Sequence, residues 1–246
     1  MKIGIIVQTR MGSTRLPGKV LMKADEKNVM LDYSINQLKN CKNFDGLVIA
    51  TSKLQRDDKI EEHCNSIQID CFRGDEADVL SRHYLCAKQH SFTHIIRIPS
   101  DKPLIDPKIV DEIIDFFIKN QFDYVANFEI YEKNGILEFN STYPSGTEVE
   151  MFSFEALEIA WKNATKKDER EHVTPYIYLN PKKFKIKIIN QKKNLSDLRW
   201  SLDYENDLIV IREIIKNIKY RPILTDHIID FLTKNPKIQN YNKIQN

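Results

Sequence analysis

The first hundred residues contain four short runs of β-branched and apolar residues. These runs are Ile3–Val7, Leu47–Thr51, Ile67–Phe72 and His94–Ile98. Both faces of each run are mostly apolar, which is typical of strands in the buried centre of a parallel sheet. The intervals carry apolar residues at helical spacing, and the expected helices are Met30–Asn40, Arg56–Asn65, Ala77–Gln89 and, after Pro107, Ile109–Ile118. This alternation predicts a doubly wound α/β sheet.

The second half of the chain is less regular. Residues 122–152 hold Tyr, Phe and Val runs broken by Asn134-Gly135 and by Pro144-Ser145-Gly146, which predicts strands or hairpins beside the main sheet. Phe184–Asn190 alternates with period two, as a strand with one solvated face does. Two further helices are expected at Glu205–Ile218 and Leu224–Leu232.

Composition limits the class of protein. The chain has 246 residues, 41% of them hydrophobic, and no linker rich in Pro, Gly or Ser. We therefore predict one domain over residues 1–233, with a small inserted β region, and a polar tail over residues 234–246. The formal net charge is only +2 and no apolar run approaches the about 20 residues of a membrane helix. We expect neither a nucleic-acid nor a membrane partner.

The cysteines indicate the redox environment. There are four of them, and no two form a CxxC pair. This spacing favours free thiols in a reducing cytosol over disulfides, and a zinc site would need ligands closer together. We therefore expect a cytoplasmic protein.

One loop concentrates positive charge directly after the first predicted strand. Its cations are Arg10, Arg15 and Lys19, and the residues between them include Gly12, Ser13, Thr14 and Gly18. Glycine lets backbone N–H groups approach an anion closely, and guanidinium forks grip phosphate oxygens. Ligands of open α/β sheets bind at the carboxyl ends of central strands. The loop therefore predicts a polyphosphate site, the alternative being a solvated basic loop.

Two familiar phosphate-binding motifs do not fit this loop. A P-loop needs G-x-x-x-x-G-K-[ST], but five residues separate Gly12 from Gly18, and Val20 stands where the magnesium-binding hydroxyl should be. A G-x-G-x-x-G fingerprint is also absent. The loop therefore indicates neither a P-loop NTPase nor a dinucleotide-binding protein.

The loop segment QTRMGSTRLPGKVL resembles the signature of cytidylyltransferases that activate acidic sugars. Five further blocks match in order, namely Phe72–Ala87, Pro99–Pro107, Tyr143–Leu157, Arg170–Tyr178 and Leu198–Leu208. The chain is similar to the spore-coat-polysaccharide-type cytidylyltransferase family, which is related to CMP-Kdo and CMP-sialic acid synthetases. The resemblance implies a three-layer nucleotide-diphosphosugar-transferase (GT-A/Rossmann-like) fold with a mostly parallel central sheet. It also implies Mg²⁺-dependent transfer of CMP from CTP, with release of pyrophosphate.

Nucleotidyl transfer requires positive charge at the α-phosphate, and Mg²⁺ prefers one or two carboxylates besides phosphate oxygens. Asp101 follows the strand His94–Ile98 and would share a sheet edge with the basic loop if the strands are parallel. The resemblance implies that Asp101 and Asp203 are the metal ligands. The alternative, without the resemblance, is that Asp101 is only a turn residue. Lys102 beside Asp101 departs from the family pattern, so the sequence does not decide whether one or two metal ions bind.

The resemblance assigns roles to further residues. The expected catalytic residues are Arg10, Lys19 and Asp101; the expected nucleotide-binding residues are Gly12, Ser13, Thr14, Arg15, Arg73 and Arg82; the expected acceptor-binding residues are Glu148, Glu150, Arg170, His172 and Arg199. Structural alternatives exist for several of them. Arg82 can pair with Asp78 on one helix face, a lone histidine is usually a structural group, and Arg199 can pair with Asp203.

Three functional classes stay open. The first is a cytidylyltransferase that uses CTP, Mg²⁺ and a small acidic or phosphorylated acceptor, and its product is either CMP-linked or CDP-linked. The second is a glycosyltransferase of the same fold, which would typically show an Asp-x-Asp triplet that this sequence lacks. The third is a non-catalytic nucleotide-binding domain, which would be expected to lack a metal carboxylate. A homodimer is one of the assemblies we expect for the chain.

Overall fold

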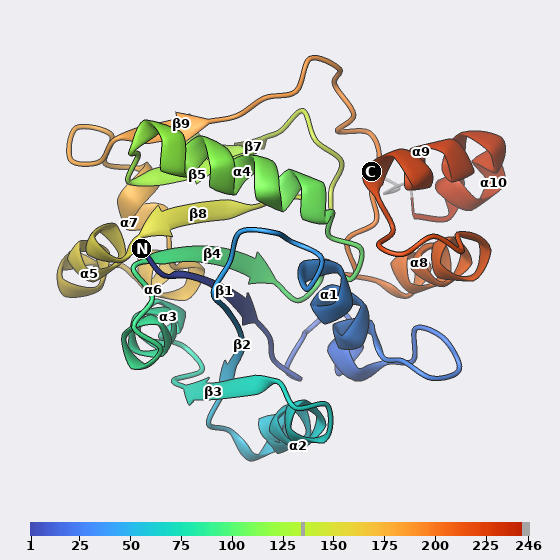
Figure 1. Ribbon diagram of the computed structural model, residues 1–246, viewed down its shortest axis with the longest axis horizontal. Coiled ribbons are helices and arrows are strands. Elements are labelled where there is room, and N and C mark those ends of the chain that lie inside the picture. The colour runs from blue at the N-terminus through green and yellow to red at the C-terminus, as the bar shows by residue number, and fades with distance from the viewer. Residues whose placement is uncertain (134–135, 243–246) are drawn as a thin grey trace.

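The structure of the chain, a computed structural model, describes residues 1–133 and 136–242 and is organised around one seven-stranded sheet (Figure 1). The strand order is β3-β2-β1-β4-β8-β5-β9. The strands are β1 (Ile3–Gln8), β2 (Gly46–Ser52), β3 (Asp70–Gly74), β4 (His94–Pro99), β5 (Tyr124–Ala126), β8 (Glu150–Ser153) and β9 (Ile186–Ile188). Strand β8 is antiparallel to β4 and β5, and the other pairings of this sheet are parallel. The expected mostly parallel α/β sheet is confirmed.

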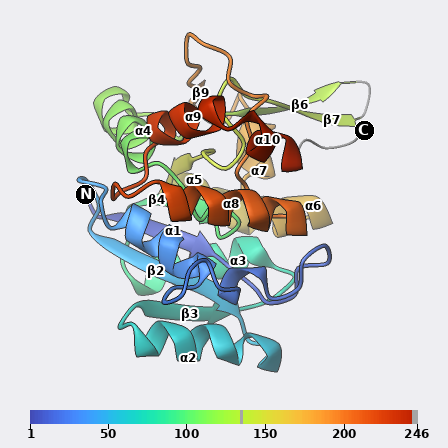
Figure 2. The same ribbon diagram turned by 90° about the vertical axis from the view of Figure 1, so that its right-hand side faces the viewer.

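Helices cover both faces of the sheet (Figure 2). They are α1 (Met30–Leu38), α2 (Asp58–Ser66), α3 (Val79–Gln89), α4 (Pro107–Asn120), α5 (Phe154–Asn163), α6 (Lys167–His172), α7 (Pro175–Tyr178), α8 (Glu205–Asn217), α9 (Thr225–Lys234) and α10 (Pro236–Gln239), with 3₁₀ turns η1 (Lys19–Leu21), η2 (Gln55–Asp57) and η3 (Asn240–Asn242). Buried side chains of α1, α2 and α4 share a core cluster with Ile5, and those of α3, α5 and α7 share another with Ile6. Adjacent residues of β1 therefore point into opposite layers.

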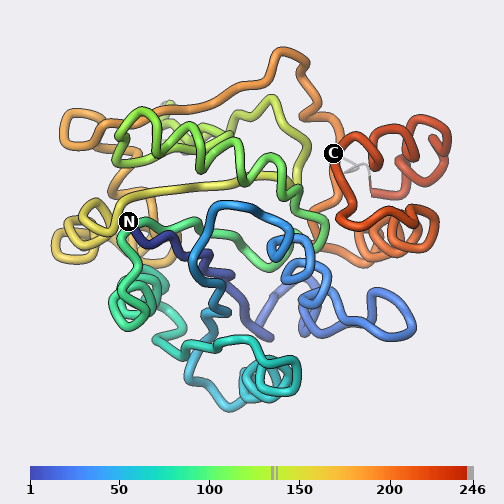
Figure 3. Tube along the Cα trace, in the orientation of Figure 1, coloured from blue at the N-terminus to red at the C-terminus, as the bar shows by residue number. Residues whose placement is uncertain are grey.

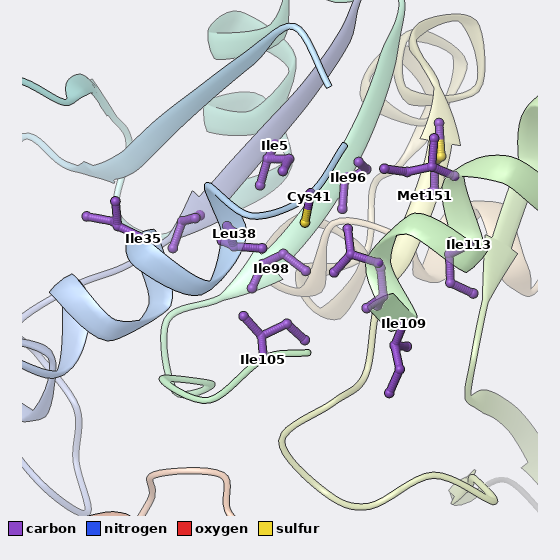
Figure 4. Packing of buried hydrophobic residues seen from close by; sticks show 14 of the residues in the cluster. Ile5, Ile35, Leu38, Cys41, Ile96, Ile98, Ile105, Ile109, Ile113 and Met151 are labelled. Carbon is purple, nitrogen blue, oxygen red and sulfur yellow. The ribbon is translucent and has the colours of Figure 1, made fainter. Parts of the chain in front are cut away.

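Isoleucine is the most frequent residue in the first core cluster. Ile5 of β1 and Ile96 of β4 lie in it together with Ile35 of α1 and Ile113 of α4 (Figure 4). A third cluster joins α8 and α9 to the fully buried Trp200. Figure 3 follows the chain from the central strand β1, in blue, to α8 and α9, in red, at one side of the molecule. None of the helices in the described part of the chain is both long and apolar enough to cross a membrane.

The inserted region contains a separate two-stranded sheet of β6 (Glu129–Lys133) and β7 (Ile136–Asn140), which pair antiparallel. The expected Asn134-Gly135 break lies outside the described residues. The second expected break is a turn in which Gly146 has a φ of 106°, a left-handed conformation that favours glycine. The pair of β6 and β7 confirms strands beside the main sheet, whereas β5 and β8 of the same region belong to the main sheet itself.

One sequence-based boundary was wrong. The third strand was expected at Ile67–Phe72 but runs over Asp70–Gly74, because Ile67 caps the C-terminus of α2 and Gln68 has a φ of 56°. Ile67 packs against the core from outside the strand. Part of the polar tail is helical, as α10 and η3 occupy residues 236–242. All four cysteines are free thiols, as expected.

Close packing at Gly4 of β1 gives a first prediction. A Cβ atom at Gly4 would come within 2.0 Å of the ring of Phe92, whereas one at Gly46 of β2 would stay 3.0 Å from the same ring. Gly4→Ala should therefore lower the free energy of unfolding by about 1–3 kcal/mol. Gly46→Ala is the matched control and should lower it by less. Equal urea midpoints for both variants and the unmodified protein would contradict this packing.

Candidate active site

Two adjoining cavities open where β1 and β4 end. The first, here the loop cavity, has a volume of about 350 Å³ and is lined by Arg10, Ser13, Thr14, Arg15, Lys19 and His172, among others. The second, the sheet cavity, has a volume of about 240 Å³ and is lined by Lys102, Phe128, Phe139, Glu148, Glu150 and Arg199, among others. Four residues line both cavities, namely Arg97, Pro99, Asp101 and Asp203. The two cavities therefore share a wall.

Hydrogen bonds within the basic loop hold its backbone. The N–H groups of Ser13 and Gly18 both donate to the carbonyl oxygen of Met11, over 3.0 and 2.9 Å. Gly18 has a φ of 72°, a left-handed conformation that costs glycine little. The chain then enters η1 at Lys19, and the buried side chain of Val20 anchors this turn in the core. The cations therefore project from a loop of fixed geometry.

Lys19 joins two carboxylates from distant parts of the chain. Its Nζ lies 3.1 Å from Oδ1 of Asp203 and 3.9 Å from Oδ2 of Asp101. The backbone supports the same arrangement, because the N–H of Leu202 donates to the carbonyl oxygen of Asp101 over 2.7 Å. Both aspartates are thus placed by one cation and by a hydrogen bond between the segments that carry them.

Asp203 is the centre of a cluster of three cations. Its carboxylate lies 2.6 Å from Arg15 and 2.8 Å from Arg199, besides its contact with Lys19. Burial would raise the pKa of Asp203, but Lys19 and Arg199 outweigh burial and hold the pKa below its usual value. Asp207 fixes the cluster, since it accepts the backbone N–H of Asp203 over 2.8 Å and pairs with Arg199 at 3.1 Å.

Asp101 differs from Asp203 in its surroundings. Oδ1 of Asp101 is buried and has no hydrogen-bond partner among the described residues. Burial raises the pKa of this carboxyl above its usual value, against the attraction of Lys19 and Lys102. Because a buried polar atom without a partner costs free energy, this oxygen is suited to a ligand that carries positive charge.

The sheet cavity is lined by charged side chains that pair with one another and by two aromatic rings. Nζ of Lys102 lies 3.1 Å from Oε2 of Glu148 and donates to the carbonyl oxygen of the same residue over 2.7 Å. Glu150 likewise pairs with Arg97. The rings of Phe128 and Phe139 stack with centroids 5.5 Å apart and an angle of 25° between their planes. Such a surface can receive a polar ligand that also has an apolar face.

Most of the expected site residues lie at these cavities. Lining the loop cavity are Arg10, Ser13, Thr14, Arg15, Lys19, Asp101, His172 and Asp203, and lining the sheet cavity are Asp101, Glu148, Glu150, Arg199 and Asp203. Gly12, Arg73, Arg82 and Arg170 are not among the lining residues of either cavity.

Arg73 lies outside both cavities and has several partners. Its guanidinium lies 2.6 Å from Asp58 and 2.8 Å from Glu61 and also donates to the carbonyl oxygens of Ser52 and Leu54. These contacts tie the end of β3 to the end of β2 and to α2. These partners are structural ones, and the expected part of Arg73 in nucleotide binding stays a prediction.

Arg170 and Arg82 also have structural partners. Arg170 pairs with Asp78 and donates to the carbonyl oxygen of Trp161 over 2.8 Å, so Asp78 does not pair with Arg82. Arg82 is buried and donates to the carbonyl oxygen of Asp75 over 3.2 Å. Burial, with a further contribution from the positive charge of Arg10, lowers the pKa of Arg82 to about 10. Arg82 is therefore a buried side chain that lines neither cavity.

Some residues of the site were missed from the sequence. Tyr204 lies under the guanidinium of Arg15, with its ring centroid 5.0 Å away. Arg97 lines both cavities although it sits inside a strand that reads as buried. A charged residue between two isoleucines of a central strand was the signal that could have identified Arg97. For Phe128 and Phe139 no such signal existed, because aromatic residues are ordinary in strands.

Comparison with known proteins identifies relatives of the chain. A protein family described as cytidylyltransferase matches residues 4–221. The spore coat polysaccharide biosynthesis protein SpsF of Bacillus subtilis is 31% identical over 240 residues, which cover 94% of each chain. A solved cytidylyltransferase from Leptospira borgpetersenii serovar Hardjo-bovis superposes with a TM-score of 0.89 at 30% identity, over 100% of both chains. A CMP:2-keto-3-deoxy-manno-octonic acid synthetase complexed with CTP shares the fold, with a TM-score of 0.65 at 13% identity over 88% of this chain and 99% of that chain.

Proposed function

The chain belongs to the cytidylyltransferase family, and from this premise we propose that it transfers CMP from CTP to a sugar acid or a related surface-polysaccharide precursor, releasing pyrophosphate. The observation that carries the proposal is the cluster of Lys19, Asp101 and Asp203 where two cavities meet. One cavity has the charge for a triphosphate, and the other has room for an acceptor. The reacting atoms would then meet at the shared wall.

The loop cavity is the proposed site of CTP. Arg10, Arg15 and Lys19 line it together with the hydroxyl groups of Ser13 and Thr14. Three cations with flanking hydroxyl donors match the charge and the acceptor oxygens of a triphosphate. The relative solved with CTP has the same fold, which supports this assignment.

Asp101 and Asp203 would hold the Mg²⁺ ion. The unpartnered, buried Oδ1 of Asp101 fits a metal ligand. The described residues contain no group of three or more His, Cys, Asp and Glu side chains that could hold a metal. Two carboxylates fit a Mg²⁺ that takes its other ligands from phosphate and water. When bound, the ion would polarise the phosphoryl oxygen and neutralise developing charge.

In the proposed reaction, an acceptor oxygen in the sheet cavity attacks the α-phosphorus of CTP. Lys19 and Arg15 would exchange their contacts with Asp203 for contacts with phosphate oxygens and so hold the triphosphate in line. The bond from the α-phosphorus to the bridging oxygen of the β-phosphate breaks, and pyrophosphate leaves. Phe128 and Phe139 would contact the apolar face of the acceptor, and they would also limit the access of water.

These observations disfavour the two other functional classes. A non-catalytic nucleotide-binding domain would have no reason to keep both aspartates beside Lys19. A glycosyltransferase is disfavoured by the family match over residues 4–221. The four free thiols favour a reducing compartment, so the cytoplasm stays our expected location. The expected homodimer also stays a prediction.

The preference for cytidine gives a second prediction. With Mg²⁺ and ligand at about 100 times Kd, CTP should add about 2.7 kcal/mol to the free energy of unfolding. For a chain of this size the gain corresponds to a rise in Tm of roughly 5–10 °C. Thermal scans with CTP, UTP, ATP and GTP at equal concentration would measure it, and CTP should give the largest shift. Equal shifts for all four triphosphates would exclude a cytidine-specific site.

A further inference from the structure

Arg97 is a charged residue in the middle of the central sheet. It lies in β4 between Ile96 and Ile98, both of which belong to the buried core, and its side chain is only 12% exposed. Arg97 nevertheless lines both the loop cavity and the sheet cavity. Burying a cation in this way is costly unless partners compensate its charge, so its position requires an explanation.

Other side chains hold Arg97 in a fixed orientation. Nε and Nη2 donate to Oε1 of Gln8 over 3.2 and 3.1 Å, and Nη1 donates to Oε2 of Glu150. The other oxygen of Glu150 accepts hydrogen bonds from Tyr124 over 2.7 Å and from Thr174 over 2.6 Å. Three of the five N–H donors of Arg97 are thereby used. One N–H on each terminal nitrogen has no partner among the described residues.

Of the four residues that line both cavities, Arg97 alone is a cation; the others are Pro99, Asp101 and Asp203. We propose, on the basis of the proposed function, that Arg97 is a further catalytic residue, whose two remaining N–H groups bind non-bridging oxygens of the α-phosphate as the acceptor attacks. Glu150 and Gln8 are its positioning residues. A guanidinium fork offers two parallel donors, which matches a phosphoryl group.

The chemical step explains why a cation is needed at this wall. The acceptor oxygen forms a bond to the α-phosphorus, and the bond to the bridging oxygen breaks. The electron pair of that bond leaves with pyrophosphate, and a hydroxyl acceptor releases its proton to water. Negative charge on the non-bridging oxygens must be stabilised throughout. Fixed donors at this position lower the barrier because no reorganisation is needed during the reaction.

The competing explanation is that Arg97 only neutralises Glu150. A buried ion pair that loses one partner destabilises a protein, whereas removing both charges together is often neutral. The two explanations therefore differ in the double variant Arg97→Met/Glu150→Gln. A purely structural pair would give a stable and active double variant. A catalytic Arg97 would give a stable double variant with a kcat far below that of Glu150→Gln alone.

The experiment compares Arg97→Met, Glu150→Gln, the double variant and Arg97→Lys in Tm, CTP affinity and steady-state pyrophosphate release. We expect kcat to fall by about a hundredfold or more in Arg97→Met and in the double variant, with CTP affinity within a few-fold of the unmodified protein. The double variant should recover the Tm that Arg97→Met loses, and Arg97→Lys should retain part of kcat. Arg212→Met is the matched control, because Arg212 is exposed and donates only to the carbonyl oxygen of Lys23 in the described structure.

Two outcomes would overturn the proposal. A double variant with kcat within threefold of the unmodified protein would reduce Arg97 to the counter-ion of Glu150 and leave the proposed function intact. Unmodified protein that releases no pyrophosphate from CTP with any acid or phosphorylated acceptor would overturn the proposed function, and the role of Arg97 with it. If Arg97→Met does not fold, the double variant and Arg97→Lys decide the question.

Discussion

Asp203→Asn and Asp101→Asn should each lower kcat by about a thousandfold, which is roughly 4 kcal/mol of transition-state stabilisation. Asparagine keeps the size of the side chain and one acceptor oxygen but removes the charge that would hold the metal. Both residues lie within 4 Å of Lys19 although a hundred residues separate them, so they should act as one unit. The double variant should therefore lose far less than the sum of the two effects. Steady-state pyrophosphate release at saturating CTP and Mg²⁺ would measure the loss.

Nucleotide binding should separate the metal role of Asp203 from a structural role. In the free protein the carboxylate of Asp203 forms ion pairs with Arg15, Lys19 and Arg199. Asp203→Asn releases these cations, so without metal the variant should bind CTP at least as tightly as the unmodified protein does. Asp230→Asn is the control, because Asp230 forms only an exposed pair with Lys234 in the described structure. Near-native turnover of Asp203→Asn with unchanged Mg²⁺ dependence would remove Asp203 from the metal site.

Lys19→Met should weaken the use of CTP by about tenfold or more, seen as a rise in the KM for CTP and a fall in kcat/KM. A tenfold loss corresponds to about 1.4 kcal/mol. The side chain of Lys19 is only 11% exposed, so solvent screens its charge weakly. Methionine keeps the length and apolar packing of the stem, so the fold should survive.

The matched control for Lys19 is Lys23→Met. Lys23 follows the same loop but is exposed, and its replacement should leave the kinetics within twofold. Lys19→Met should also give a smaller increase in Tm with CTP than the unmodified protein gives. If both lysine variants behave alike, the loop is a solvated basic surface and not a phosphate site.

The sheet and its order of strands and helices could be predicted because local periodicity determines them. Ile3–Val7 and His94–Ile98 read correctly as central strands, since isoleucines on both faces of a strand require layers on both sides. The third strand was misplaced because Ile67 and Ile69 are apolar for another reason. They pack against the core from the turn that links α2 to β3.

The sequence predicted the place of a site residue only where a residue with suitable chemistry also follows a strand. Lys19 lies in the loop after β1 and Asp101 lies just after β4, so their location at one sheet edge follows from the parallel topology. The charge partner of Arg73 could not be predicted, because Asp58 and Glu61 reach it through the packing of α2 on β3. The same holds for Arg15 and Asp203, which lie 188 residues apart. Pairing of this kind depends on tertiary geometry that no local pattern encodes.

The direction of β8 has a consequence for how this enzyme can diversify. Because β8 is antiparallel to β4, Glu148 and Glu150 line the sheet cavity at the start of their strand. The basic loop, in contrast, follows the end of β1. The segment between β5 and β8 supplies Phe128 and Phe139 as well. Insertions or exchanges in that one segment would remodel the acceptor side while β1 and its loop stay unchanged. If the sheet cavity receives the acceptor, as proposed, exchanging this segment between relatives should change the acceptor without altering the proposed site of CTP.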